Sequence, residues 1–208
     1  YYWLRDDTRK DAKMLAYLKA ENAYADAMLA SSKPLANRLY DEIVGRIKQD
    51  DSSVPYRERG YWYYSRYETG KDYPIYARRK GTMEGAEEIL LDVNVMAKGK
   101  DYFSVGDWEV SQDNNVLAWA EDAVGRRQYV IKFKNLTTGE VYTDEVKGVA
   151  ANLVWADDNK TLFYVWNDPK TLLTTRVQKH VLGTAASAGA LAAAIGRASC
   201  RERVSDTV

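Results

Sequence analysis

The sequence has only one cysteine and one histidine in 208 residues. A single cysteine, Cys200, excludes a disulfide framework within the chain and fits a reducing compartment such as the cytoplasm. A single histidine, His180, leaves too few nitrogen and sulfur side chains for an ordinary zinc centre. We therefore expect neither a metal nor another cofactor.

Net charge is absent as well, because 30 basic residues balance 30 acidic residues. A neutral chain has no overall field that would draw it to nucleic acid or to an anionic membrane, and we expect neither as a partner. No apolar run approaches the roughly 20 residues of a membrane-spanning helix, and no signal peptide opens the chain. These absences predict a cytoplasmic protein.

Aromatic residues, by contrast, are plentiful, with 16 tyrosines and 6 tryptophans. They gather in two runs, residues 61–79 and 116–133, and a turn at Gly70 or Gly125 divides each run. Aromatic and β-branched residues on both sides of a glycine turn predict an antiparallel hairpin. The two runs superpose when Gly70 is placed on Gly125, so we expect a repeated hairpin unit.

A second repeat involves two polar turns. Asp113 and Asn114 stand between apolar strands in the same way as Asp158 and Asn159 do further along the chain. Asp and Asn suit such turns because their short side chains bond to the neighbouring backbone and tolerate a left-handed φ. A repeat of about 45 residues that consists of short strands is typical of β-propeller blades.

Two amphipathic helices are predicted ahead of the repeats, because apolar residues recur there at spacings of three or four. The first stripe consists of Met14, Leu18, Ala25 and Leu29. The second consists of Leu35, Leu39, Ile43 and Ile47. Thr8 and Asp11 resemble the start of the first helix, and Pro34 suits the first turn of the second helix, which we expect to end near Gln49. Both helices should cover an apolar core.

A polar connector, residues 50–56, joins these helices to the first hairpin. Asp50 and Asp51 could be metal ligands, but a solvated linker is favoured because no further ligands converge on them. After the first hairpin, residues 87–92 are predicted to be a further strand of the same blade. Residues 93–100 are predicted to contain a short helix.

Several segments resemble the prolyl oligopeptidase family of serine peptidases. The segments that resemble the start of the family are YWLRDD at residues 2–7, AENAY at 20–24, GYWYYSR at 60–66 and ETGKDYPIY at 68–76. Those most similar to the oligopeptidase B branch are EILLDVN at 88–94, GRRQY at 125–129, LVWADD at 153–158 and VQKHVLGT at 177–184. The resemblance covers residues 1–184 without a large gap, and we identify the chain as an N-terminal fragment of such a peptidase.

The resemblance implies a two-domain enzyme. In the family, an α/β-hydrolase domain carries the Ser, Asp and His, and a seven-bladed propeller restricts access to peptide-sized substrates. The oligopeptidase B branch cleaves after Arg and Lys, so the implied substrates are short peptides that contain these residues. The implied fold is mainly β, with N-terminal helices (residues 1–50) that pack on the missing hydrolase domain, followed by about two to three blades (51–184).

The catalytic residues themselves are missing from the sequence. No Gly-x-Ser-x-Gly elbow is present, and the segment around Ser187 lacks its first glycine. His180 lies in a strand-like run and has no paired nucleophile, so we predict an ordinary strand residue and an inactive fragment. Residues 185–208 change abruptly in composition and are expected to be a non-native tail, in which Cys200 as a reactive thiol is the less favoured interpretation.

Two alternatives belong to other functional classes. A free-standing binding propeller would use strand tryptophans as a ligand surface, although packing between blades is favoured; these residues are Trp62, Trp108, Trp119, Trp155 and Trp166. A single-stranded nucleic-acid binder would combine tyrosines with a basic cluster, although a solvated strand face is favoured. The cluster consists of Arg57, Arg59, Arg66, Arg78, Arg79 and Lys80.

Overall fold

The computed structural model of the chain describes residues 2–6, 8–171, 173–185 and 190–194. It divides into two compact units, Tyr1–Gln49 and Asp50–Val208. The first unit is helical, and the second consists almost entirely of strands.

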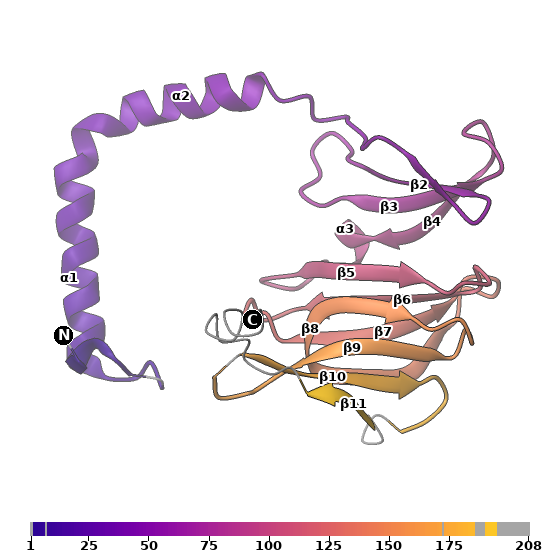
Figure 1. Cartoon of the computed structure of the whole chain (residues 1–208). Coiled ribbons are helices and arrows are strands. Elements are labelled where there is room, and N and C mark those ends of the chain that lie inside the picture. The colour runs from indigo at the N-terminus through magenta and orange to yellow at the C-terminus, as the bar shows by residue number, and fades with distance from the viewer. Residues whose placement is uncertain (1, 7, 172, 186–189, 195–208) are drawn as a thin grey trace, which may run out of the picture. The chain divides into compact units, whose positions relative to one another are not determined.

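The helical unit contains the two predicted helices, α1 (Ala12–Leu29) and α2 (Lys33–Gly45), which a short 3-10 turn (Ala30–Ser32) connects (Figure 1). Asp11 is the N-cap of α1, because its carboxylate accepts a hydrogen bond of 2.8 Å from the Met14 amide. The acid expected in the first turn therefore precedes the helix. Pro34 lies in the first turn of α2 as predicted, and α2 ends at Gly45, a few residues before the expected end.

The apolar stripes of the two helices are mostly exposed. Met14 is buried, but Leu18, Leu35 and Ile43 are 43%, 49% and 60% exposed. The core that these stripes were expected to cover is therefore not formed by the described residues of this unit.

The second unit begins with a four-stranded antiparallel sheet in chain order, which we call blade 1 (Figure 1). Its strands are β1 (Tyr56–Glu58), β2 (Tyr61–Arg66), β3 (Ile75–Lys80) and β4 (Glu87–Asp92). The first predicted hairpin is confirmed as β2 and β3, and the predicted further strand is β4. The predicted short helix is α3 (Val93–Met96), whose N-cap is Asp92.

A second sheet has seven strands, in the order β11-β10-β9-β8-β7-β6-β5. These strands are β5 (Ser104–Val110), β6 (Val116–Asp122), β7 (Tyr129–Asn135), β8 (Val141–Trp155), β9 (Thr161–Asn167), β10 (Thr174–Val181) and β11 (Ala190–Ala194). The second predicted hairpin is confirmed as β6 and β7.

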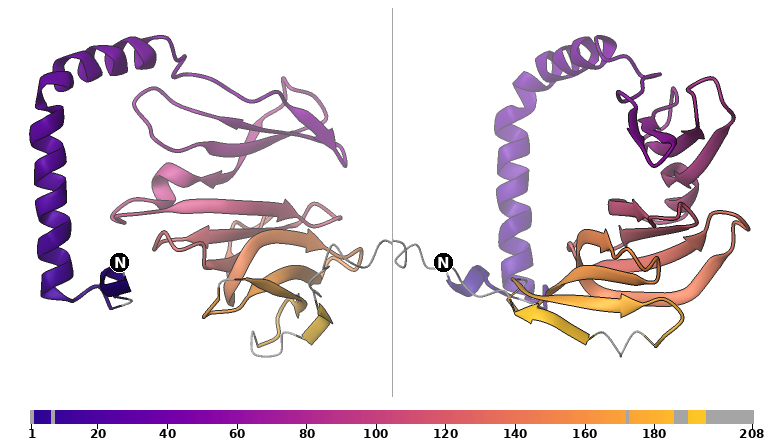
Figure 2. Two further views of the ribbon diagram at one scale, coloured as in Figure 1. Left: turned by 60° about the vertical axis from the view of Figure 1, so that its left-hand side comes forward. Right: turned by 45° about the vertical axis from the view of Figure 1, so that its right-hand side comes forward.

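The long strand β8 belongs to two blades. Its first part pairs with β7, its last residues pair with β9, and the register shifts between Val149 and Leu153. Figure 2 shows how strongly β8 curves between these partners. We therefore call β5–β7 with residues 141–149 blade 2, and the remainder of β8 with β9–β11 blade 3.

The two polar turns adopt the predicted left-handed backbone, with φ of 64° at Asn114 and 57° at Asn159. They also contact each other, because the Asn159 side-chain oxygen accepts a hydrogen bond of 2.8 Å from the Asp113 amide. The repeat seen in the sequence thus becomes a direct contact between the turns of neighbouring blades.

The core lies between the blades. One buried cluster includes Tyr63 and Leu90 of blade 1 and Val110 and Leu117 of blade 2. The other joins blade 2 to blade 3 and includes Phe133, Trp155 and Leu162. For Trp119 and Trp155, which are buried in these clusters, packing between blades is the observed role.

The tail that we expected to be non-native contains one described element. Within residues 185–208, β11 pairs with β10, with Ala190 opposite Lys179. Ser187 and Cys200 lie outside the described residues. The non-native origin of the tail stays a prediction.

Candidate functional site

The single histidine of the chain lies at the contact between blades 2 and 3. β10 carries His180, and β8 carries Asp144, whose carboxylate contacts the imidazole ring. His180 Nε2 lies 2.9 Å from Asp144 Oδ2, and the same oxygen accepts a hydrogen bond of 2.7 Å from the Gly183 amide. Because an ionised carboxylate only accepts, this geometry places a proton on Nε2. The pair joins the outer part of blade 2 to the third strand of blade 3.

The histidine ring is enclosed on its other side. His180 is almost fully buried, and the ring of Phe133 lies 5.5 Å from it, centroid to centroid. The Nδ1 atom is buried without a hydrogen-bond partner among the described residues.

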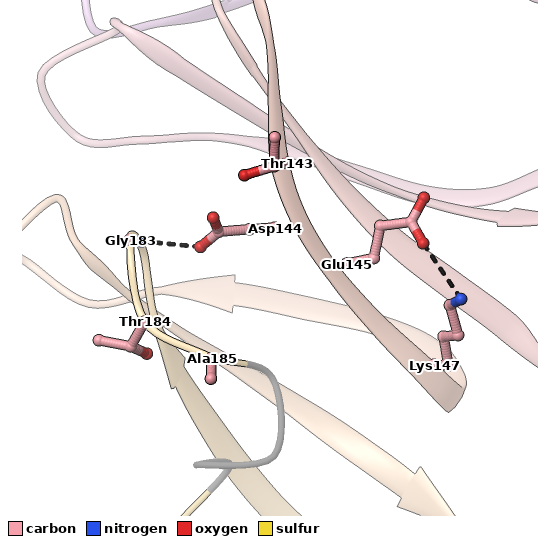
Figure 3. A pocket seen from close by; sticks show the side chains of 7 residues that line it. All are labelled: Thr143, Asp144, Glu145, Lys147, Gly183, Thr184 and Ala185. Carbon is pink, nitrogen blue, oxygen red and sulfur yellow. Dashed lines mark hydrogen bonds and ion pairs between the residues drawn. The ribbon is translucent and has the colours of Figure 1, made fainter.

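A shallow surface pocket lies beside the pair (Figure 3). Its walls are residues 143–145, Lys147 and residues 183–185. Figure 3 shows Asp144 pointing toward Gly183, while Glu145 turns to Lys147, whose ammonium lies 3.3 Å from its carboxylate. This hydrogen bond is the main reason why the pKa of Glu145 lies below its ordinary value.

The pocket does not contain the parts of a hydrolytic triad. The Thr184 hydroxyl donates to the Val181 carbonyl oxygen at 2.6 Å, and no serine or cysteine is among the residues that line the pocket. A histidine and a carboxylate without a nucleophile cannot carry out acyl transfer. His180 is buried and lies in strand β10, in agreement with the predicted strand. Its lack of a catalytic role stays a prediction. The sequence contained no signal for its partner Asp144, which is 36 residues away in the chain.

The pair should matter for stability. We expect Asp144→Ala to lower the free energy of unfolding by about 2 kcal/mol, because the buried Nε2 hydrogen loses its acceptor. Asp144→Asn should cost less, since its amide oxygen can still accept. Urea denaturation followed by tryptophan fluorescence measures both changes, and the exposed Asp157→Ala serves as the control. Equal effects of Asp144→Ala and Asp157→Ala would contradict a supporting role for the pair.

The basic cluster on blade 1 is engaged by carboxylates. Arg66 lies 3.0 Å from Glu87, and the Arg78 Nε atom lies 2.8 Å from Glu88. The hydrogen bond from Arg66 is the main reason why the pKa of Glu87 lies below its ordinary value. The Arg78 guanidinium also stacks over the Tyr61 ring at 4.1 Å. This pairing favours a structural network over the open basic groove that a nucleic-acid interface requires.

The structure also bears on two other features that were considered from the sequence, a metal site and a membrane-spanning helix. Among the described residues, no three His, Cys, Asp or Glu side chains come together as a metal site would require, and this includes the surroundings of Asp50. No helix in the described part of the chain is long and apolar enough to cross a membrane.

Comparison with known proteins shows which proteins share this sequence and architecture. The family model of the prolyl oligopeptidase N-terminal β-propeller domain matches residues 1–195. Dipeptidyl aminopeptidase BI of Pseudoxanthomonas mexicana is 60% identical, over 92% of this chain and 28% of that protein. Protease 2 of Moraxella lacunata is 32% identical, over 81% of this chain and 25% of that protein.

Solved structures agree with the sequence comparisons. Oligopeptidase B from Leishmania major is 34% identical with a TM-score of 0.84, over 92% of this chain and 27% of that one. Oligopeptidase B from Trypanosoma brucei, in a closed form with covalently bound antipain, is 30% identical with a TM-score of 0.82. This chain thus spans only about a quarter of the length of its relatives. It belongs to the prolyl oligopeptidase family, of which it represents the N-terminal helices and the first blades of the β-propeller.

Proposed function

We propose that this chain is the N-terminal propeller portion of a cytoplasmic serine endopeptidase of the oligopeptidase B type. The complete enzyme would cleave short peptides after Arg or Lys, and the propeller would restrict the size of the peptides that reach the catalytic domain. The observation that carries this proposal is the agreement of the fold with oligopeptidase B, at a TM-score of 0.84 over 92% of the chain.

The chain alone is proposed to be inactive. Its sequence contains no Gly-x-Ser-x-Gly elbow. Its histidine is held by Asp144 in a buried contact between blades. Acyl transfer would thus depend on a catalytic domain beyond this chain, which is the partner that the proposal requires.

The first step of the experiment determines how the reading frame continues. Sequencing the source DNA across the codons for Thr184 and Ala185 establishes whether the frame continues into further blades and a hydrolase domain. The chain alone and any longer product are then assayed on N-terminally blocked fluorogenic peptides with Arg, Lys or Ala before the scissile bond. We expect no turnover by the chain alone, and turnover after Arg and Lys by the longer product.

Peptide length tests the second part of the proposal. A series in which one Arg-containing site is embedded in peptides of increasing length should show kcat/KM falling steeply for the longest members. A long unfolded protein cleaved as fast as a short peptide would contradict size restriction by the propeller.

A second activity has its own support, because the 60% identical relative bears the name dipeptidyl aminopeptidase BI. An enzyme that releases N-terminal dipeptides requires a free α-amino group, whereas an endopeptidase does not. Preference for unblocked over blocked substrates by the longer product would favour this activity.

A free-standing binding propeller remains the alternative from another class. It predicts a reading frame that ends after Val208 and a chain that binds a ligand without turning it over.

A further inference from the structure

A groove between blades 1 and 2 offers a second place on the propeller unit where a ligand can bind. We call it the interblade groove, and its volume is about 440 Å³. One wall is the end of β4 together with α3, and the other wall belongs to the strands β6 to β8 and to the turn between β7 and β8. The residues that line the groove are residues 89–92, Val95, Met96, Trp119, Lys134, Gly139 and Val141.

Most of the lining is apolar. Leu90, Leu91 and Trp119 are buried in the cluster that blades 1 and 2 share, so they form the deep part of the groove. The mouth consists of exposed aliphatic side chains, which are Ile89, Val95 and Val141. Apolar side chains that gather around a hollow on the surface favour a ligand with apolar groups of its own.

A cation lies at one end of the apolar lining. Lys134 of β7 reaches across to blade 1, where its Nζ atom lies 3.4 Å from the Leu90 carbonyl oxygen. Its neighbour Lys132 is 3.0 Å from Glu121, whereas the described part of the chain gives Lys134 no carboxylate partner. An ammonium group has three hydrogens to donate, and one long bond to a carbonyl oxygen leaves it able to bind the carboxylate of a ligand.

An anion lies two residues further along β4. Asp92 is the last residue of this strand, and its Oδ1 atom accepts hydrogen bonds of 3.0 Å and 3.3 Å from the amides of Asn94 and Val95. Within the described residues, its Oδ2 atom has no hydrogen-bond partner. A carboxylate oxygen in this state can accept from the ammonium group of a ligand.

The spacing of these two charges limits the length of the ligand. Lys134 is held at the Leu90 carbonyl, and Leu90 and Asp92 are two residues apart, which is about 6.5 Å along a strand. Two residues of an extended peptide span at most about 7 Å. A single amino acid is too short for both charges, and a fatty acid would leave the charge of Asp92 against its chain. A dipeptide with free ends matches both charges.

We propose that the interblade groove binds a free dipeptide with apolar side chains. The α-ammonium group lies at Asp92, the carboxylate lies at Lys134, and the side chains contact the apolar lining between them. Hydrolysis of peptide bonds is the class of reaction that supplies such a ligand, so a peptidase with this propeller would bind a product of its own chemistry here. Binding requires no catalytic residue and is measured without turnover, so its failure is distinct from failure of the proposed peptidase activity.

Isothermal titration calorimetry of the full 208-residue chain with leucyl-leucine tests the proposal. For a ligand of this size we expect a Kd on the order of 0.1 to 1 mM. Glycyl-glycine has the same charges without the apolar side chains and should bind at least about tenfold more weakly. Absence of binding by leucyl-leucine up to roughly 10 mM, or equal binding of the two dipeptides, would overturn the proposal.

Variants of the chain and blocked ligands together assign each end of the dipeptide. Asp92→Asn keeps an oxygen that can cap α3, and Lys134→Met keeps the apolar stem, so each variant removes mainly a charge. Each should weaken leucyl-leucine about tenfold, as should acetylation of its amino group or amidation of its carboxylate. Acetylation should cost nothing further in Asp92→Asn, and amidation nothing further in Lys134→Met. The exposed Asp157→Asn and Lys170→Met are the matched controls and should leave the affinity unchanged.

Two further outcomes would contradict the assignment. A leucyl-leucine blocked at both ends that binds as tightly as the free dipeptide would overturn the proposal and indicate an internal segment of another protein as the occupant. An affinity that neither Asp92→Asn nor Lys134→Met changes would place the dipeptide elsewhere on the chain. The comparison of free, blocked and glycine ligands uses the unaltered chain, so it decides the proposal even where a variant does not fold.

Discussion

Replacing Phe133 by alanine is expected to lower the free energy of unfolding of the propeller unit by about 4 kcal/mol. Phe133 lies on β7 and is fully buried. Its ring packs edge to face on Trp155 at 5.9 Å and beside His180 at 5.5 Å. The substitution would leave a cavity between two blades that share a sheet, where the backbone has little freedom to collapse.

Urea denaturation of the two proteins measures this loss, and Val124→Ala is the control because Val124 is 71% exposed. Phe133→Leu should recover about half of the loss, since it retains part of the buried volume. A loss below about 1 kcal/mol for Phe133→Ala would mean that the core between blades 2 and 3 is not packed as described.

Replacing Arg78 by alanine is expected to cost about 3 kcal/mol. The Arg78 side chain is 3% exposed, and its guanidinium donates to both carboxylate oxygens of Glu88, at 2.8 and 2.9 Å. It also donates to the Asn114 carbonyl oxygen at 3.2 Å and so joins β3 to the turn between β5 and β6. Without it, the partly buried Glu88 carboxylate and the Asn114 carbonyl oxygen, at the contact between blades 1 and 2, lose their donors.

Arg78→Lys separates charge from geometry. Lysine retains the charge but not the planar fork, so it should recover only a minor part of the stability. Arg57→Ala is the matched control, because Arg57 is exposed on β1 of the same blade. The measurement is the urea midpoint together with its slope, and the prediction is wrong if Arg78→Ala and Arg57→Ala behave alike.

Much of the strand pattern could be predicted from the sequence because it depends on local chemistry. The run around Gly70 predicted β2 and β3, and the run around Gly125 predicted β6 and β7. Asn114 and Asn159 were correctly predicted to occupy turns with a left-handed backbone. In each case neighbouring residues determine the conformation, so a single sequence contains the necessary information.

The ends of the helices were less predictable. Asp11 satisfies the criteria for a residue of the first turn and for a cap equally well, and only the hydrogen bond to the Met14 amide identifies it as the cap. The second helix ends at Gly45, although its apolar pattern continues to Ile47. Apolar spacing predicts which face of a helix is apolar, but not where the helix stops.

The contacts of the candidate site were even less predictable from the sequence than the helix ends. His180 was correctly predicted to be a strand residue, but its bond to Asp144 depends on how β10 of blade 3 meets β8 of blade 2. The bond from Arg59 to the Val110 carbonyl oxygen likewise forms only because the turn after β1 meets the end of β5. Neither contact has a periodicity or a motif that the sequence alone reveals.

The two hairpins, the two polar turns and the family could be predicted from the residues alone, because these follow from spacing, from turn chemistry and from long specific motifs. The sharing of strand β8 by blades 2 and 3, and the joining of blade 1 to them by side chains, became known only from the folded structure. The physical reason is that pairing between distant strands depends on the packing of whole sheets. The register shift between Val149 and Leu153 accompanies the change of partner along β8 from β7 to β9, and no local motif in the sequence marks it.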